Sequence, residues 1–274
     1  MVSNDPTPLV TTGQHPSLIL PPPMPAQSPR SYPLGVAELD CAGVGLREGD
    51  VVALQAPAER HHDSREAALE AVKRTATAIA AHAESRSVVV VVTVTAAGTA
   101  ADAVQLLEQV RSAGLDESLI RDHVRLAAVT TMAELIHAVA TVVAAGCTVT
   151  ALVVLDYGLL AGRSTGTEHH RREPDTVRRG DAELLTLLAG GHLATAFHSE
   201  IGITAGRVGL DLGAHDQIAV LVTTRSPRPR GAAPRHTSRF TAAEATTDRH
   251  LLKVASVVYD LTLGTLKCRH LRAA

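Results

Sequence analysis

The stretch that decides the fold is residues 88–95, Val-Val-Val-Val-Val-Thr-Val-Thr. Every side chain in it is branched at Cβ, and such residues favour extended strands. The run is apolar almost throughout instead of alternating with polar residues, as expected for a strand covered on both faces. Residues 151–156, Ala-Leu-Val-Val-Leu-Asp, form a second such strand and end in a carboxylate. Two strands of this kind predict a mainly parallel sheet with helices on both faces.

Segments with helical spacing alternate with short apolar runs along the rest of the chain. Helices are expected over residues 64–84 (started by the capping box Asp63-x-x-Glu66), Ala100–Ser112, the segment after Thr131-x-x-Glu134, and Asp181–Ala189. Further strands are expected over Val51–Ala56, Arg125–Val129, Leu193–His198, Gln217–Thr224 and Leu251–Val258. This alternation predicts a three-layer α/β fold.

Length and composition exclude several classes of protein. The chain has 274 residues with 26 basic and 28 acidic side chains, and its net charge of −2 excludes a uniformly basic nucleic-acid coat. Three widely spaced cysteines argue against a disulfide scaffold or a Cys-rich zinc module. Aromatic residues make up 2% of the chain, which argues against a stacking platform for single-stranded bases. Because no apolar run of transmembrane length and no signal-peptide pattern is present, the expected location is the cytoplasm.

The N-terminal part of the chain differs in composition from the rest. Residues 1–33 hold nine of the 14 prolines, including Pro21-Pro22-Pro23, and show no hydrophobic periodicity. This composition is typical of a disordered, proline-rich tail. The folded domain is therefore expected to span residues 34–274.

Two arginine-rich segments each follow an expected strand. Residues 163–179 are polar and basic, and residues 225–239 contain five arginines and no acidic residue. Ligands of open α/β sheets bind beyond the carboxyl ends of the strands, so both segments could contact DNA or phosphate, although a solvated loop would have the same composition. The candidate DNA-binding residues are Arg163, Arg171, Arg172, Arg178, Arg179, Arg225, Arg228, Arg230, Arg235 and Arg239.

Three segments, in order over residues 34–271, carry a resemblance to a known family. They are Leu34-Gly35-Val36-Ala37-Glu38-Leu39-Asp40 with Gly45-Leu46-Arg47-Glu48-Gly49-Asp50, the strand 152–155 with Asp156-Tyr157, and the stretch from Leu252 to Leu266. Together they resemble the RecA-like ATPase domain of DnaB-type replicative helicases, in its entry segment, Walker B strand and late hairpin. The resemblance implies a RecA-like fold of the P-loop NTPase type, with Asp156 at the position of the metal-holding carboxylate.

The residues at the family's phosphate loop depart from its pattern. Such a loop needs glycines where its backbone closes on the phosphates, a lysine to meet their charge, and a Ser or Thr to hold Mg²⁺. Here residues 55–64 read Gln-Ala-Pro-Ala-Glu-Arg-His-His-Asp-Ser, without glycine or lysine. The lysine position falls on His62 or, with a shift of one, on Asp63, and the hydroxyl position falls on Asp63 or Ser64. Glu59 and Asp63 would repel a triphosphate, whereas Arg60, His61 and His62 could offset this repulsion and bind an anion weakly.

Other catalytic positions of the family are also replaced. Thr95 stands where the family carries a catalytic Glu, and threonine is no base at neutral pH. Residues 255–259, Ala-Ser-Val-Val-Tyr, lack the Lys and Arg that would reach a neighbouring subunit's nucleotide, and His198 stands at the position of a polar sensor. Only Asp156 remains of the set, and a structural role for it weighs as much as a functional one.

Other constellations give weaker signals. His61-His62 and His169-His170 lack the helical spacing of a zinc site, so they are expected to be surface residues, and no metal is expected. A Ser-His-Asp triad stays open on composition, but Gly-x-Ser-x-Gly is absent.

Three functions follow from these observations. The leading hypothesis is a non-catalytic, helicase-related pseudo-ATPase with an accessory or regulatory role in DNA transactions, which needs no cofactor. It would contact DNA through the arginine-rich segments or associate with itself or with helicase-like subunits. One alternative is an active, divergent ATPase or helicase that uses ATP and Mg²⁺ held by Asp156. The other is a protein-interaction module without nucleic acid.

Overall fold

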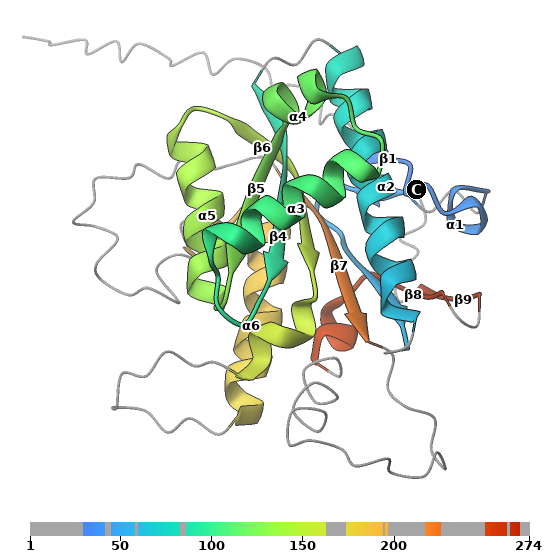
Figure 1. Cartoon of the computed structure of the whole chain (residues 1–274). Coiled ribbons are helices and arrows are strands. Elements are labelled where there is room, and N and C mark those ends of the chain that lie inside the picture. The colour runs from blue at the N-terminus through green and yellow to red at the C-terminus, as the bar shows by residue number, and fades with distance from the viewer. Residues whose placement is uncertain are drawn as a thin grey trace, which may run out of the picture.

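The computed structural model describes residues 30–41, 45–57, 60–82, 86–162, 174–193, 195–196, 217–225, 250–261 and 264–268. Within them, seven strands form one sheet in the order β5-β4-β6-β7-β3-β8-β9 (Figure 1). The first six strands in this order are mutually parallel and β9 is antiparallel to β8. The predicted tail lies outside the described residues, apart from a short antiparallel pair of β1 and β2 that includes Ser31 and Tyr32.

Strands and helical segments alternate from the third strand to the seventh, and two helices lie between the fourth and fifth strands. The strands are β1 (Ser31–Tyr32), β2 (Leu46–Arg47), β3 (Val51–Ala56), β4 (Ser87–Val94), β5 (Val124–Val129), β6 (Thr148–Leu155), β7 (Ala219–Arg225), β8 (Val257–Asp260) and β9 (Thr265–Cys268). The helices are α1 (Ala37–Cys41), α2 (His61–Ala81), α3 (Ala100–Ser112), α4 (Glu117–His123), α5 (Met132–Ala144) and α6 (Pro174–Ala189), with a 3₁₀ helix at Tyr157–Gly162.

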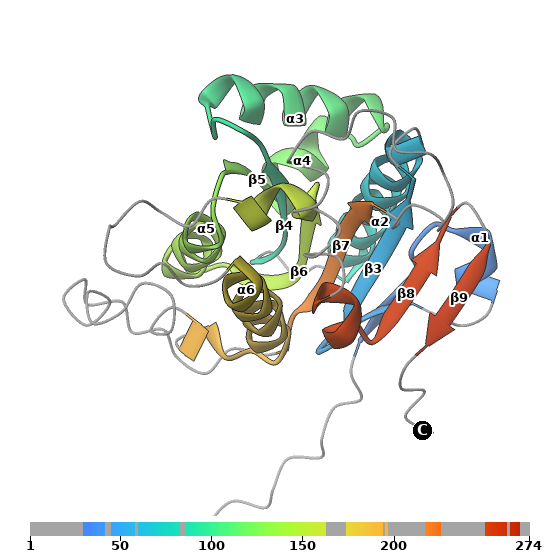
Figure 2. The ribbon, with the colours of Figure 1, turned by 90° about the horizontal axis from the view of Figure 1, so that it is seen from below.

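The valine run forms β4, and its side chains divide between two cores. Val88, Val90 and Val92 pack on one face with residues of α5 and α6. Val89 and Val91 pack on the other face with residues of α2, α3 and α4. Figure 2 shows α6 on one side of the strands and α2 with α3 on the other. The predicted three-layer α/β fold is confirmed, and it is consistent with the RecA-like architecture that the sequence resemblance implies.

The pairing of β4 with β6 contains one irregularity. Val88 pairs with Val149 and Val89 pairs with Ala151, so Thr150 is an extra residue in β6. Val149 and Leu152 consequently face the same core, whereas Ala151 faces the opposite one. A bulge of this kind changes the phase of a strand without ending it.

The start of α2 differs from the prediction. The helix begins at His61, three residues before the expected start, and its N-cap is Arg60, which makes no side-chain capping bond. Asp63 lies inside the first turn and accepts a hydrogen bond from Arg60 Nε at 2.7 Å. The predicted capping box at Asp63 is therefore wrong. The helix starts earlier because the chain already turns at Pro57, whose carbonyl accepts from the Arg60 N–H at 2.9 Å.

Two other predicted helix starts are confirmed by their caps. The N-cap Thr131 accepts from the Glu134 N–H at 3.2 Å at the start of α5. The expected helix 100–112 is α3, and its N-cap Thr99 forms a capping box with Asp102. Hydrogen bonds from the Thr99 backbone and side chain, the largest causes, lower the pKa of Asp102.

Two predicted strands are wrong in whole or in part. Leu193, Thr195 and Ala196 are helical, and the Ala196 N–H donates to the His192 carbonyl at 2.9 Å. Residues 250–254 are also helical, and the strand β8 starts only at Val257. Short apolar runs have no periodicity that separates a buried strand from a buried helix, which accounts for both errors.

The structure shows what stabilises two of the segments quoted above, the turn before α1 and the hairpin of β8 and β9. The Asp40 carboxylate accepts from the backbone N–H groups of Leu34 and Gly35 at 2.8 and 3.0 Å, which closes the turn before α1. Gly35 has φ of +80°, a conformation that favours glycine. β8 and β9 form the expected hairpin, with Gly264 at φ of +58° in the connecting turn.

Candidate functional site

The candidate site lies at the carboxyl edge of the sheet, where β6 ends and α2 begins. Asp156 follows β6 directly and has φ of +61°, a left-handed conformation that Asp tolerates better than most residues. Its N–H donates to Thr223 Oγ1 of the neighbouring strand β7 at 2.9 Å. Asp156 is 9% exposed. The turn and this hydrogen bond fix the carboxylate in a partly buried position.

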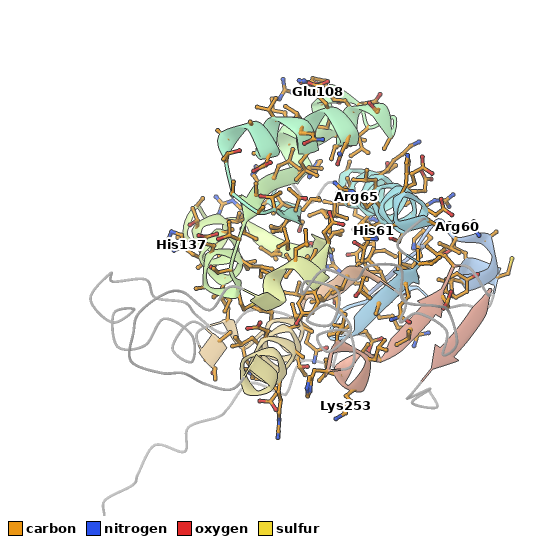
Figure 3. All side chains as sticks on the ribbon, turned by 60° about the horizontal axis from the view of Figure 1, so that its bottom comes forward. Arg60, His61, Arg65, Glu108, His137 and Lys253 are labelled. Atoms are coloured by element: carbon orange, nitrogen blue, oxygen red, sulfur yellow. The ribbon has the colours of Figure 1, made fainter. Side chains whose placement is uncertain are left out.

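Both carboxylate oxygens of Asp156 have partners on α2. His61 Nε2 contacts Oδ1, and Arg65 Nη1 donates to Oδ2. His61 and Arg65 are four residues apart, so they lie on the same face of the helix. Their side chains are 14% and 26% exposed. Figure 3 shows both residues on α2, together with Arg60 at its start.

Arg65 extends this cluster to a third element. Its Nη2 donates to Gln109 Oε1 on α3 at 2.6 Å. One guanidinium therefore joins the end of β6 to α2 and α3. An arginine with one charge-assisted partner and a second polar partner is held more firmly than one with a single contact.

Ser64, His61 and Asp156 resemble a Ser-His-Asp triad in their order of contacts, but they do not form one. Ser64 Oγ lies 3.3 Å from His61 Nδ1, yet it donates to the His61 carbonyl at 2.8 Å. The Ser64 side chain is fully buried. A nucleophile must reach its substrate, so Ser64 instead has a structural role. Burial also prevents its hydroxyl from binding Mg²⁺ in this conformation.

The structure separates the three basic residues expected to meet phosphate. His61 points inward to Asp156, whereas His62 is 77% exposed and lies 3.5 Å from Glu66. Arg60 is 53% exposed and pairs with Asp63. The inward-facing residue at the start of α2 is thus His61, not His62 as the sequence register suggests.

Thr95, which the sequence resemblance aligns with a catalytic Glu, is part of a turn. Its Oγ1 donates to Asp102 at 3.0 Å and accepts from the Gly98 N–H at 2.8 Å. These bonds connect the end of β4 to the start of α3. Thr95 therefore supports the local structure.

The candidate DNA-binding arginines fall into two groups. Arg178 and Arg179 belong to α6, which starts at Pro174, so they are not in a loop as expected. The Arg179 side chain is exposed and donates to Glu183 at 2.7 Å, and this contact raises its pKa. Arg225 ends β7, and its side chain is outside the described part. Arg163, Arg171, Arg172, Arg228, Arg230, Arg235 and Arg239 lie outside the described residues, as do Glu59, His169, His170 and His198.

Sequence reasoning missed three members of the cluster. His61 and Arg65 are four residues apart, a spacing that could have identified Arg65 as a second residue of the same face had the helix been expected to start at His61. Gln109 and Thr223 come from distant elements and carry no local signal.

The described residues contain neither a metal cluster nor a membrane span. No group of three or more His, Cys, Asp or Glu side chains among them could hold a metal ion. No helix in the described ranges is long and apolar enough to cross a membrane.

Two comparisons of the sequence with known proteins gave no match. No protein-family model matches the chain, and no curated protein matches it. The resemblance to DnaB-type helicases accordingly depends on the quoted segments and on a compatible fold.

Proposed function

We propose that this protein is a pseudo-ATPase that keeps a RecA-like scaffold and has an accessory or regulatory role in DNA transactions. The observation that carries the proposal is that both carboxylate oxygens of Asp156 already have side-chain partners. The carboxylate that the resemblance puts at the metal-holding position pairs with Arg65 and contacts His61 of the same chain. Protein side chains thus take the place that a metal ion would need.

The energetics of this cluster favour a role without Mg²⁺. Magnesium requires open oxygen ligands in near-octahedral geometry. To reach Asp156, the ion would have to displace two partners from a carboxylate that is 9% exposed. Breaking a buried ion pair costs on the order of 3–5 kcal/mol. The chain offers no phosphate-loop lysine or glycines in residues 55–64 to compensate for that cost.

The topology supports a role for the arginine-rich segments. β6 and β7 are parallel neighbours, and Val154 pairs with Val222. The chain therefore leaves the sheet from adjacent strand ends before residues 163–179 and before residues 226–239. Both segments start from the edge that carries Asp156, where ligands of open α/β sheets bind.

Nucleotide binding tests the pseudo-ATPase assignment directly. The full chain would be titrated with fluorescent ATP and Mg²⁺ up to about 1 mM, the upper end of ordinary KM values. We expect no saturable binding and no phosphate release. Micromolar binding with turnover that is lost in Asp156→Ala would overturn the assignment and support the active ATPase instead.

DNA binding tests the second half of the proposal. The affinity for a duplex of about 20 base pairs, followed by fluorescence anisotropy, should fall steeply between about 50 and 200 mM salt. Replacing Arg228, Arg230, Arg235 and Arg239 with Ala should weaken binding, and the salt slope should decrease by about one for each phosphate that these arginines no longer neutralise.

The matched control removes the same charge elsewhere, at Arg47, Arg86, Arg111 and Arg121. Equal decreases in affinity of the two variants would show that only net charge matters. Absence of binding at low salt would favour the protein-interaction module without nucleic acid.

One observation favours the active ATPase as a second candidate. Three basic residues, Arg60, His61 and Arg65, lie at the start of the 21-residue helix α2, whose N-terminal N–H groups attract anions. The turnover measurement described above separates this candidate from the leading one.

A further inference from the structure

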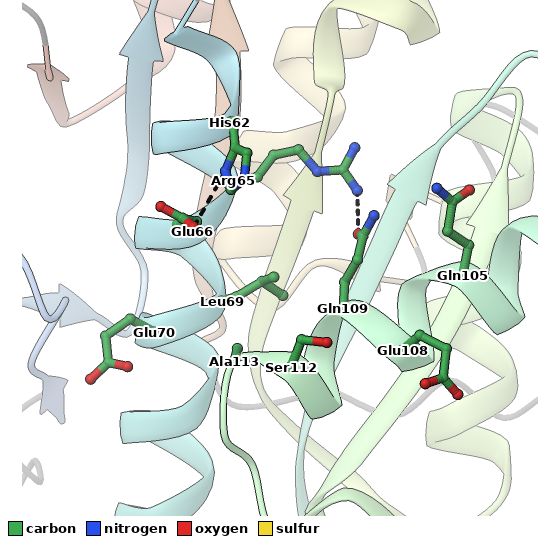
Figure 4. Close-up of a pocket in the computed structure, with 10 residues that line it drawn as sticks. All are labelled: His62, Arg65, Glu66, Leu69, Glu70, Gln105, Glu108, Gln109, Ser112 and Ala113. Atoms are coloured by element: carbon green, nitrogen blue, oxygen red, sulfur yellow. Dashed lines mark hydrogen bonds and ion pairs between the residues drawn. The ribbon is translucent and has the colours of Figure 1, made fainter.

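A groove runs between α2 and α3 on the outer side of one helical layer. It encloses about 820 Å³ and is lined by α2 from His62 to Glu70 and by α3 from Gln105 to Ala113 (Figure 4). On each helix the lining residues follow the spacing i, i+3, i+4, i+7 and i+8, which marks one continuous face. One face of α2 and one face of α3 therefore form opposite walls of the groove, and their side chains do not fill the space between them.

The groove stays open because α3 packs on the sheet more than on α2. The buried residues of α3 are Leu106 and Val110, which belong to the core under the helix. Most of the residues that line the groove are polar or charged, although their aliphatic carbons also face it. Arg65 Nη2 bridges the two walls through Gln109, at the end of the groove next to Asp156.

The charge of the groove is negative. Glu66 and Glu70 lie one turn apart on the α2 wall, and Glu108 lies on the α3 wall. Their ion-pair partners are residues of the same helix, three or four positions away, and such exposed pairs contribute little. Arg65 also lines the groove, but Asp156 balances its charge. Three carboxylates thus line the groove, whereas the cations that pair with Glu70 and Glu108 are not part of its lining.

We propose that this groove binds an arginine- or lysine-rich peptide segment of a partner protein. The apolar residues of the lining are Leu69 and Ala113, which are too few to provide the row of pockets that the apolar face of an amphipathic helix needs. Long basic side chains fit better, because their aliphatic stems can lie on Leu69 while their charged groups reach the glutamates. Gln105, Gln109 and Ser112 provide amide and hydroxyl groups for the peptide backbone. The volume lies within the range of ordinary ligand sites.

The first test measures binding of a fluorescein-labelled octa-arginine peptide to the full chain by anisotropy at about 150 mM salt. The variant Glu66→Gln, Glu70→Gln, Glu108→Gln keeps side-chain size and removes three charges. Its affinity should fall at least about tenfold, which corresponds to about 1.4 kcal/mol. The matched control Glu117→Gln, Asp122→Asn, Glu183→Gln removes the same charge from exposed sites outside the groove, and it should change affinity less than about twofold.

Equal effects of the two triple variants, or no effect of the first, would refute the groove as the binding site. A second variant, Ser112→Trp, fills the groove without a change of charge and should also weaken binding. Its fold would be checked by circular dichroism, and unchanged peptide affinity in a folded Ser112→Trp protein would count against the proposal.

A third measurement tests whether the groove binds a segment of a partner protein or the chain's own residues 225–239. The variant with Arg228, Arg230, Arg235 and Arg239 replaced by Ala should bind octa-arginine as tightly as the parent. Binding that appears only in this variant would assign the groove to the chain's own arginines and overturn the proposal of a partner. The outcome is independent of nucleotide binding, so it does not depend on the proposed function.

Discussion

Two neighbouring strands, β4 and β6, end beside carboxylates that are used in different ways. At the end of β6, Asp156 is nearly buried and contacts His61 and Arg65, which are 95 and 91 residues away in the chain. At the end of β4, Asp102 is half-buried and bonds with Thr95 and Thr99, seven and three residues away. One carboxylate connects separate elements, whereas the other closes a local turn.

The difference shows how burial and sequence separation determine how much stability is lost when a contact is removed. A buried carboxylate that loses its cationic partners, or the reverse, leaves an uncompensated charge in a low-dielectric region. An exposed cap leaves only groups that water can reach. Changes at the end of β6 should therefore be much more costly than changes at the end of β4.

The largest effect is expected for Asp156→Asn. Asparagine tolerates the left-handed backbone of this position, so the variant isolates the charge. The free energy of unfolding should fall by about 3 kcal/mol or more, because Arg65 loses its counter-ion and His61 loses its carboxylate partner. Urea denaturation measures it, and a change below about 1 kcal/mol would show that the cluster contributes little.

Two arginines near the start of α2 give a matched comparison. Arg65→Ala removes the bridge between Asp156 and Gln109 and should cost about 2–3 kcal/mol, less than a fully buried pair because Arg65 is 26% exposed. Arg60→Ala removes an exposed pair with Asp63 and should cost less than about 0.5 kcal/mol. Equal costs from urea denaturation would contradict the importance given to the Asp156 cluster.

At the end of β4, Thr99→Ala removes the N-cap of α3. Loss of a threonine cap costs about 1 kcal/mol, so this variant should fall between the two arginine variants. Thr99→Ser keeps the hydroxyl and should restore most of the stability. A null effect of Thr99→Ala in thermal unfolding would mean that the capping box does not stabilise the helix.

The smallest effect is expected from pH. The pKa of Asp102 in the folded protein lies below its ordinary value of 3.8, chiefly because of the bond from the Thr99 backbone. The folded state therefore binds this proton more weakly than the unfolded state. The contribution of Asp102 is present above pH 3.8 and is lost as the pH falls through the lowered pKa. A pH series of urea midpoints for the parent and Asp102→Asn should converge in that acidic range, and parallel curves would contradict this linkage.

The same contrast explains what the sequence could predict. The valine run and the strand before Asp156 identified the central strands, because continuous apolar residues are typical of doubly covered strands. The caps at Thr131 and Thr99 depend on residues three apart, and the helices they start were found. The errors at residues 193–196 and 250–254 occurred where short apolar runs lack periodicity.

The candidate site was predicted only in part. Asp156 could be identified because a carboxylate directly follows an apolar strand. Its partners could not, because His61 and His62 are adjacent in sequence and only the true start of α2 decides which one faces inward. The contact of Arg65 with Gln109 depends on the placement of α3, which no local pattern sets. The groove between the two helices was missed for the same reason.

The extra residue Thr150 has a consequence for how this chain can vary in length. It lies near the amino end of β6, and the five residues after it alternate regularly between the two cores. A change of one residue is thus absorbed before the strand reaches its carboxyl end. Insertions or deletions at the amino ends of these strands can be accommodated while the spacing of Leu155, Asp156 and their neighbours stays constant.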